Sequence, residues 1–168
     1  MFSFRFAVLV LVIFVVALGG CAADGIEEID DTNYPGDLPT LLIGEWGFAT
    51  ETYTIEENSL EYVFLDEEWG DFGYKGEISF VSNYSPNSGV IIIRYTEFPP
   101  FGDSTKPYTA FYYRNLGNNT VQLANVINQG DFSSADTATL EEAIAKFTRG
   151  QMGNFVDWSV VNPQIRAN

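Results

Sequence analysis

Apolar and polar residues alternate over short stretches of this chain, and turn-forming residues separate the stretches. Residues 51–55 and 74–83 alternate most clearly, and the second segment is predicted to place Ile78 and Phe80 on one face. A period of two residues is typical of a strand with one buried face. Further strands are predicted at residues 41–49, 60–65, 108–115 and 120–127, with turns at 56–59, 85–89 and 117–119.

Residues 90–95 form the most strongly β-prone run, Val-Ile-Ile-Ile-Arg-Tyr. A continuous apolar run of this length that follows a turn is typical of a strand buried on both faces. We therefore expect a central strand here. Residues 98–103 contain Pro99 and Pro100, which cannot pair in a sheet interior, so this segment is predicted to be an exposed loop.

One segment has helical periodicity. Residues 139–149 begin with a Thr139-x-x-Glu142 capping box, end before Gly150, and place apolar residues at helical spacing. We expect this helix to pack on the sheet or to plug one end of a barrel. Residues 154–161 are again rich in strand formers, and are predicted to be the closing strand.

The pattern from residue 40 to 168 predicts a mainly β domain, an antiparallel up-and-down barrel with one C-terminal α-helix. Gly44-Glu45-Trp46 resembles the G-x-W opening of the lipocalin and calycin barrels. The resemblance implies a tryptophan packed under the barrel floor, a mouth that holds a small apolar ligand, and an arginine stacked on the tryptophan. Arg94 and Arg114 are the candidates for that arginine, and we find no T-D-Y stretch.

The N-terminus has the pattern of an export signal. Arg5 precedes an uninterrupted apolar segment, residues 6–18, and Leu18-Gly19-Gly20-Cys21 follows. This ending resembles a bacterial lipobox, which implies that residues 1–20 are removed and that Cys21 carries lipid in the cell envelope. The alternative is an uncleaved spanning helix over residues 6–23. From residue 41 the chain also resembles uncharacterised spirochaete lipoproteins, notably at residues 89–93 and 138–150.

Charge and composition narrow the functional classes. The net charge is −15, so a nucleic-acid partner is not expected, because phosphate binding needs a basic surface. Residues 21–39 are acidic and poor in apolar side chains, which predicts a disordered, lipidated tether. Histidine is absent, which excludes triads with an imidazole base. We expect neither an enzyme nor a cofactor.

The acidic residues offer two other interpretations. Asp66, Glu67, Glu68 and Asp71 could bind a hard cation, but their spacing does not match an EF-hand, and a solvated loop is the preferred interpretation. Paired carboxylates could also serve glycoside hydrolysis, yet the sequence singles out no pair. We therefore expect no metal site.

Two functional hypotheses remain. In the first, the domain is a lipocalin-like binder of a small apolar or amphipathic ligand. In the second, it is a surface interaction or structural protein with a filled core, whose loops at residues 69–72 and 98–101 contact a protein partner. The ligand-binding residues predicted for the first hypothesis are the inward-facing ones: Ile78, Phe80, Ile91, Ile93, Tyr95 and Phe111.

Overall fold

The computed structural model describes residues 31–67, 70–100, 102–131 and 133–167. The predicted signal peptide at residues 1–20 and the lipidated Cys21 lie outside these ranges. In chain order the elements are η1 (Thr40–Leu42), β1 (Gly44–Phe48), β2 (Glu51–Ile55), β3 (Ser59–Phe64), β4 (Phe72–Ser85), β5 (Ser88–Glu97), β6 (Tyr108–Arg114), β7 (Thr120–Asn125), α2 (Leu140–Lys146), η2 (Met152–Asn154) and β8 (Pro163–Arg166).

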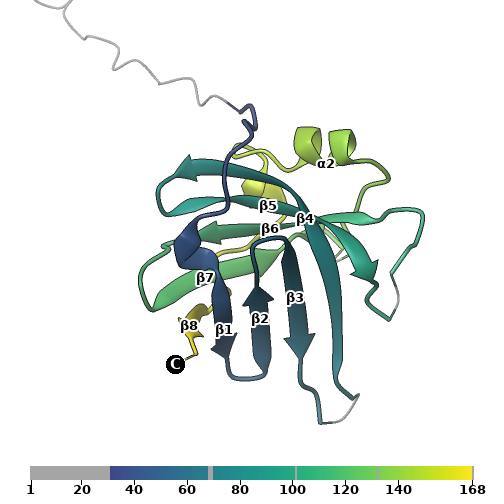
Figure 1. Ribbon diagram of the computed structural model, residues 1–168. Coiled ribbons are helices and arrows are strands. Elements are labelled where there is room, and N and C mark those ends of the chain that lie inside the picture. The colour runs from purple at the N-terminus through teal and green to yellow at the C-terminus, as the bar shows by residue number, and fades with distance from the viewer. Residues whose placement is uncertain (1–30, 68–69, 101, 132, 168) are drawn as a thin grey trace, which may run out of the picture. The chain divides into compact units, whose positions relative to one another are not determined.

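The strands form a closed antiparallel barrel in which each strand pairs with the next along the chain, and β8 pairs with β1 (Figure 1). This up-and-down order confirms the predicted fold class, a lipocalin-like barrel with one C-terminal helix. The predicted strands at residues 51–55, 60–65, 74–83, 90–95, 108–115 and 120–127 correspond to β2 through β7. At residues 41–49 the strand begins later than predicted, because η1 occupies the first part.

Strand β5 is buried on both faces, as the apolar run predicted. Ile91 and Ile93 belong to an inner cluster within the barrel, whereas Val90 and Ile92 belong to an outer cluster that also contains Phe147. All four of these β5 side chains have no exposed surface. The domain therefore has two apolar cores, one enclosed by the sheet and one between the sheet and the segments that cover it.

A β-bulge in β4 changes the predicted alternation. Ile78 pairs with Ile93 and Phe80 with Ile92, so Ser79 is an additional residue without a partner of its own. An additional residue reverses which face the following side chains occupy. Ile78 therefore packs against the inner cluster, but Phe80 packs against the outer one. The prediction that both face inward was wrong for Phe80.

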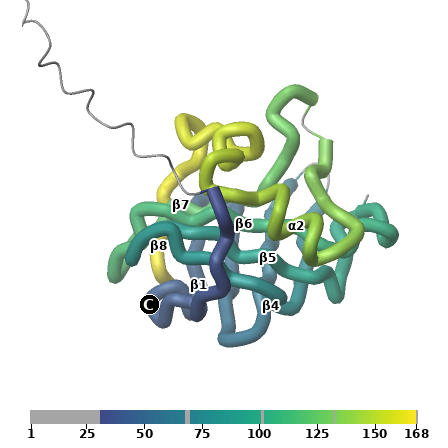
Figure 2. Tube along the Cα trace, turned by 90° about the horizontal axis from the view of Figure 1, so that it is seen from above, coloured from purple at the N-terminus to yellow at the C-terminus, as the bar shows by residue number. Residues whose placement is uncertain are grey.

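The helix lies on the outside of the barrel, against β5 and β6 (Figure 2). Its predicted capping box is present, because Thr139 Oγ1 accepts a hydrogen bond from the Glu142 backbone N–H and Glu142 accepts one from the Thr139 backbone N–H. The helix is shorter than predicted and ends at Lys146. Phe147 leaves the helix axis and is fully buried in the outer cluster.

The segment before the barrel is more ordered than predicted. Residues 31–39 were expected to belong to a disordered tether, yet Asn33 is buried and donates hydrogen bonds to the Ile144 and Phe147 carbonyl oxygens at 2.8 and 3.0 Å. The Gly36 N–H donates to the Val81 carbonyl oxygen at 2.8 Å. The domain thus begins before residue 40. The acidic composition of residues 31–39 gave no indication of these hydrogen bonds, because their acceptors are backbone carbonyl groups.

The closing strand also differs from the prediction. Residues 154–161 form no strand, and Phe155 and Val156 pack into the outer cluster instead. Strand β8 is Pro163–Arg166, in which Gln164 is buried and Ile165 is exposed. This burial pattern is the reverse of the usual apolar-in order, so the hydrophobic pattern gave no indication of it. In the described part of the chain, no helix is long and apolar enough to cross a membrane.

Candidate functional site in the barrel mouth

The end of the barrel next to η1 is closed by Trp46 and Arg166. The Trp46 side chain has no exposed surface, and its indole Nε1 donates to the Leu42 carbonyl oxygen at 2.8 Å. The Arg166 guanidinium lies 4.3 Å from the centre of the Trp46 ring and donates hydrogen bonds to the Ile43, Leu41 and Asn118 carbonyl oxygens. A guanidinium in this position is attracted to the ring face. Its hydrogen bonds also connect β8 to residues 41–43 and to the turn at Asn118.

Gly44 makes room for this arrangement. Its φ of +142° is rarely adopted by residues with side chains, and a Cβ atom there would lie 2.9 Å from the Arg166 guanidinium. The G-x-W pattern therefore has a physical basis in this chain. The predicted candidates for the stacking arginine were wrong, because Arg94 is exposed and Arg114 lies over Trp158 at 4.3 Å. Arg166 was missed because it follows Ile165 in a strand that the hydrophobic pattern did not predict.

Above this floor, aromatic side chains fill the barrel. Six of them contact one another, with ring centres 4.9–6.1 Å apart. Five come from strands β2 to β6, one from each, and the sixth comes from the loop after β5. Two of the six pairs, Tyr53–Phe111 and Tyr74–Tyr95, are edge-to-face, an arrangement that adds to the energy of burial alone. We call these residues the aromatic cluster: Tyr53, Tyr62, Tyr74, Tyr95, Phe98 and Phe111.

Two cavities open at the other end of the barrel, above the aromatic cluster. The first, of about 570 Å³, lies between β2, β3, the end of β7 and residues 160–162. The second, of about 640 Å³, lies between the start of β4, the loop that follows β5, and the end of β7 with the residues after it. Both are lined by Phe72, Tyr74, Asn125 and Ile127, so they are adjacent parts of one mouth.

The predicted ligand-binding residues lie mostly below these cavities. Ile91, Ile93 and Phe111 have no exposed surface and belong to the packed inner cluster, as does the partly buried Ile78. Of the six predicted residues, Tyr95 lines a mouth cavity. Five residues that line the cavities were not predicted from the sequence, although the inward positions near the mouth ends of the strands indicate the two tyrosines: Tyr62, Tyr74, Glu51, Asn125 and Asp136.

The tyrosine hydroxyls bring polar groups into the mouth. The Tyr62 hydroxyl donates to Glu51 Oε1 at 3.3 Å, and Gln164 Nε2 donates to Glu51 Oε2 at 3.3 Å. Burial, and then the charge of Glu51, raise the pKa of Tyr62 above its ordinary value. The Tyr74 hydroxyl oxygen is buried and has no hydrogen-bond partner among the residues that the structure describes. An unsatisfied buried polar group costs free energy, so this hydroxyl is an exception that a ligand group or a water molecule would relieve.

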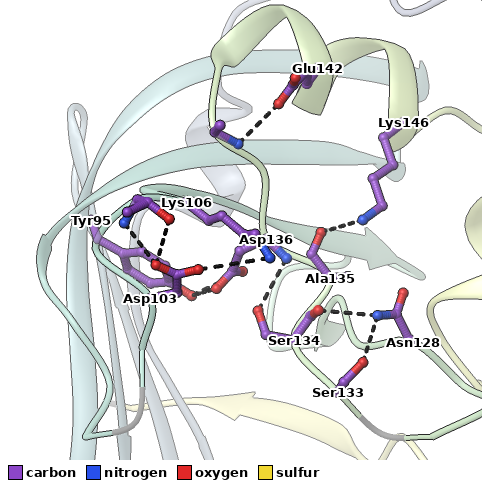
Figure 3. A network of polar contacts seen from close by, with 12 residues as sticks. Tyr95, Asp103, Lys106, Asn128, Ser133, Ser134, Ala135, Asp136, Glu142 and Lys146 are labelled. Atoms are coloured by element: carbon purple, nitrogen blue, oxygen red, sulfur yellow. Dashed lines mark hydrogen bonds and ion pairs between the residues drawn. The ribbon is translucent and has the colours of Figure 1, made fainter.

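Asp136 is held at the rim by the connection between β7 and α2 (Figure 3). The Tyr95 hydroxyl donates to Asp136 Oδ1 at 3.3 Å, and the Asp136 backbone N–H donates to Ser134 Oγ at 3.1 Å. Lys146 Nζ fixes the same connection by donating to the Ala135 carbonyl oxygen at 2.6 Å. Burial, and then Asp136, raise the pKa of Tyr95. This connection therefore sets the position of one wall of the second cavity.

The acidic loop and the two loops predicted to contact a partner are only partly described. Among the described residues, no group of three or more metal-ligating side chains lies close enough to hold an ion, and Glu68 is outside them. Trp69 and Phe101 are outside them as well. Phe72 lines both cavities, and the Phe98 ring lies 5.0 Å from Tyr95.

No family model, curated protein or solved structure matches this chain. The structure alone therefore defines the class of this protein, which is a closed lipocalin-like barrel.

Proposed function

We propose that this chain is a lipid-anchored protein of the bacterial cell envelope, whose barrel mouth binds a small apolar or amphipathic ligand without catalysis. The observation that carries the proposal is the pair of adjoining, largely apolar cavities of about 570 and 640 Å³ at one end of the barrel. Cavities of this size accommodate a drug-sized molecule. The closed floor at Trp46 makes the mouth the route by which a ligand reaches the interior.

The anchor rests on the sequence Leu18-Gly19-Gly20-Cys21. Mass spectrometry of the protein extracted from membranes tests it, and the expected N-terminus is Cys21 carrying diacylglycerol and an acylated amine. An intact Met1, or an unmodified Cys21, would contradict this part of the proposal. The ligand-binding part does not depend on that result.

Binding can be tested with N-phenyl-1-naphthylamine, a neutral apolar dye whose fluorescence rises in apolar surroundings. The full chain, in neutral maltoside micelles, is compared with an Ile127→Trp variant, since Ile127 lines both cavities and a larger side chain would block the passage between them. Ile165→Trp is the matched control, because Ile165 is 56% exposed on the outside of the barrel. We expect a fluorescence gain over micelles alone, lost only in Ile127→Trp. An equal response from all three proteins would contradict a site in the mouth.

The second hypothesis, a protein-protein interaction, has an observation of its own. Apolar side chains at the rim are unusually exposed, Val160 at 72%, Phe48 at 40% and Phe72 at 39%. All three line the first cavity, and a partner could cover them as a contiguous apolar patch. Native mass spectrometry distinguishes the two functions. A small adduct on the extracted protein favours the ligand binder, whereas a bare chain with no dye response favours the interaction protein.

A further inference from the structure

The first mouth cavity combines many aromatic rings with a single charge. Among the described residues, Glu51 is the one charged side chain that lines it, and no described lysine or arginine lines either cavity. Six aromatic side chains share the lining of the first cavity with Glu51: Phe48, Tyr53, Tyr62, Phe64, Phe72 and Tyr74.

Glu51 stands between two of these rings. It begins β2, directly opposite Phe48 on β1 and Phe64 on β3. Residues opposite one another on neighbouring strands have side chains on the same face, so the carboxylate is flanked by an aromatic ring on each side. Its hydrogen-bond donors, Tyr62 and Gln164, are both neutral, and no lysine or arginine forms an ion pair with it in the described part of the chain. The negative charge in this cavity is therefore uncompensated.

The second cavity carries two carboxylates, Asp71 and Asp136. Asp136 lies beside Lys106 and Lys146, which line a neighbouring groove together with it (Figure 3), and these ammonium groups offset part of its charge. Asp71 is exposed, so water and salt weaken its attraction for a ligand cation. Three aromatic side chains line this cavity, against six in the first, so a positively charged ligand group is favoured most strongly next to Glu51.

We propose that the ligand carries an organic ammonium group, which binds at Glu51 within the aromatic side chains of the first cavity. This inference rests on the proposed ligand-binding function. Aromatic faces attract cations, most strongly when water is excluded, and a carboxylate adds direct charge attraction. The unpartnered Tyr74 hydroxyl, whose oxygen can accept a hydrogen bond, is an independent indication that a polar ligand group enters the mouth.

The charge of the whole protein acts in the same direction. A net charge of −15 raises the concentration of cations near the surface and speeds their association. An anionic head group, such as a fatty-acid carboxylate, would instead meet Glu51 with no lysine or arginine in the cavity to pair with it. The geometry therefore favours a cationic amphiphile over an anionic one.

Three small ligands of similar volume test the charge preference: benzyltrimethylammonium, the neutral alcohol 2-methyl-1-phenylpropan-2-ol, and the anion phenylmethanesulfonate. Binding is measured by isothermal titration calorimetry on the full chain in neutral maltoside micelles, with protein-free micelles as the blank. We expect the cation to bind about tenfold more tightly than the alcohol, and the anion more weakly than both. Raising the salt concentration should weaken binding of the cation alone.

Two variants locate the charge that is responsible. Glu51→Gln keeps an acceptor for Tyr62 but removes the charge, and should weaken cation binding about tenfold while leaving the alcohol unaffected. Glu61→Gln is the matched control, because it makes the same change in net charge at a half-exposed residue of β3 that pairs with Lys75 and does not line the cavity. It should leave the binding of all three ligands unchanged.

The outcomes separate the two levels of the proposal. If none of the ligands binds the unmodified protein, the proposed ligand-binding function fails. If the alcohol or the anion binds as tightly as the cation, or if Glu61→Gln weakens cation binding as much as Glu51→Gln does, the ammonium inference is overturned while the ligand site stands. The comparison among ligands needs no variant, so it holds even if Glu51→Gln does not fold. Competition by dihexanoylphosphatidylcholine would support the inference and assign the ammonium group to a lipid head group.

Discussion

Replacing Arg166 by methionine should destabilise the barrel more than any other single change of a basic side chain to methionine in the described residues. Methionine keeps an unbranched apolar stem over Trp46 but removes the guanidinium. That group lies 4.3 Å from the ring centre and donates to three backbone carbonyl oxygens that belong to η1, the residue before β1, and the β6–β7 turn. Its loss would therefore weaken the closure of the barrel and the floor at once.

The magnitude follows from these contacts. The cation–π contact contributes about 1 kcal/mol. The partly buried hydrogen bond to Ile43 contributes about 1.5 kcal/mol, and the two exposed ones about 0.5 kcal/mol each. We therefore expect Arg166→Met to lower the free energy of unfolding by about 3.5 kcal/mol, a large fraction of the stability of an ordinary domain.

The chain provides a matched control in Arg114. Its guanidinium lies at the same distance, 4.3 Å, from the Trp158 ring, but it donates a single hydrogen bond within the described residues, to Gln122 Oε1 at 2.8 Å. Arg114→Met should cost about 1.5 kcal/mol, one cation–π contact and part of one hydrogen bond. Urea unfolding of the full chain in neutral micelles, followed by tryptophan fluorescence, measures both. If Arg166→Met costs no more than Arg114→Met, the barrel-closing role of Arg166 is refuted.

Three further changes test other parts of the structure. Tyr74→Phe removes a buried hydroxyl without a partner, so the free energy of unfolding should stay unchanged or rise by about 1 kcal/mol in urea unfolding, and a clear loss would show that the hydroxyl is satisfied. Asn33→Ala removes two hydrogen bonds to the end of α2 and a third that Asn33 accepts from the Tyr84 hydroxyl, and should cost about 2 kcal/mol in the same assay, whereas no loss would support a disordered tether. Burial raises the pKa of Tyr113 to about 12, and the pKa values of the other buried tyrosines higher still, so the folded state favours the protonated phenols. The free energy of unfolding should therefore be at its full value below pH 10 and should fall as the pH rises from 10 towards 12. Absorbance at 295 nm should show these tyrosines ionising together with unfolding, and ionisation at pH 10 in the intact fold would contradict their burial.

The parts of the fold that the sequence predicted are those where local pattern and burial agree. Residues 51–55 alternate, and β2 occupies the same residues. The capping box at Thr139 is a local signal that needs no tertiary contact, and it marks the start of α2. The apolar run in β5 predicted burial on both faces, because a strand without polar positions has no face to expose to water.

The errors occur where a distant partner determines the structure. Ser79 carries no local mark of a bulge, so the change of face at Phe80 depends on pairing with β5. Strand β8 is held by its neighbours β1 and β7 rather than by an apolar inner face, which is why Arg166 could not be recognised as the partner of Trp46. The candidate site was missed for a related reason, since its residues come from the ends of strands that the sequence places far apart.

The division of the barrel into a packed floor and an open mouth explains why the predicted ligand residues and the observed cavities differ. Ile91, Ile93 and Phe111 are the most apolar inward residues, and for that reason they pack against one another and exclude a ligand. A side chain available to a ligand must instead have an exposed surface or an unpaired hydrogen-bonding group in the empty protein. Phe72 has an exposed ring, and the Tyr74 hydroxyl is unpaired among the described residues. The most apolar inward residues therefore identify the core of such a barrel. Its binding residues are better sought among inward aromatic and polar side chains near the mouth ends of the strands.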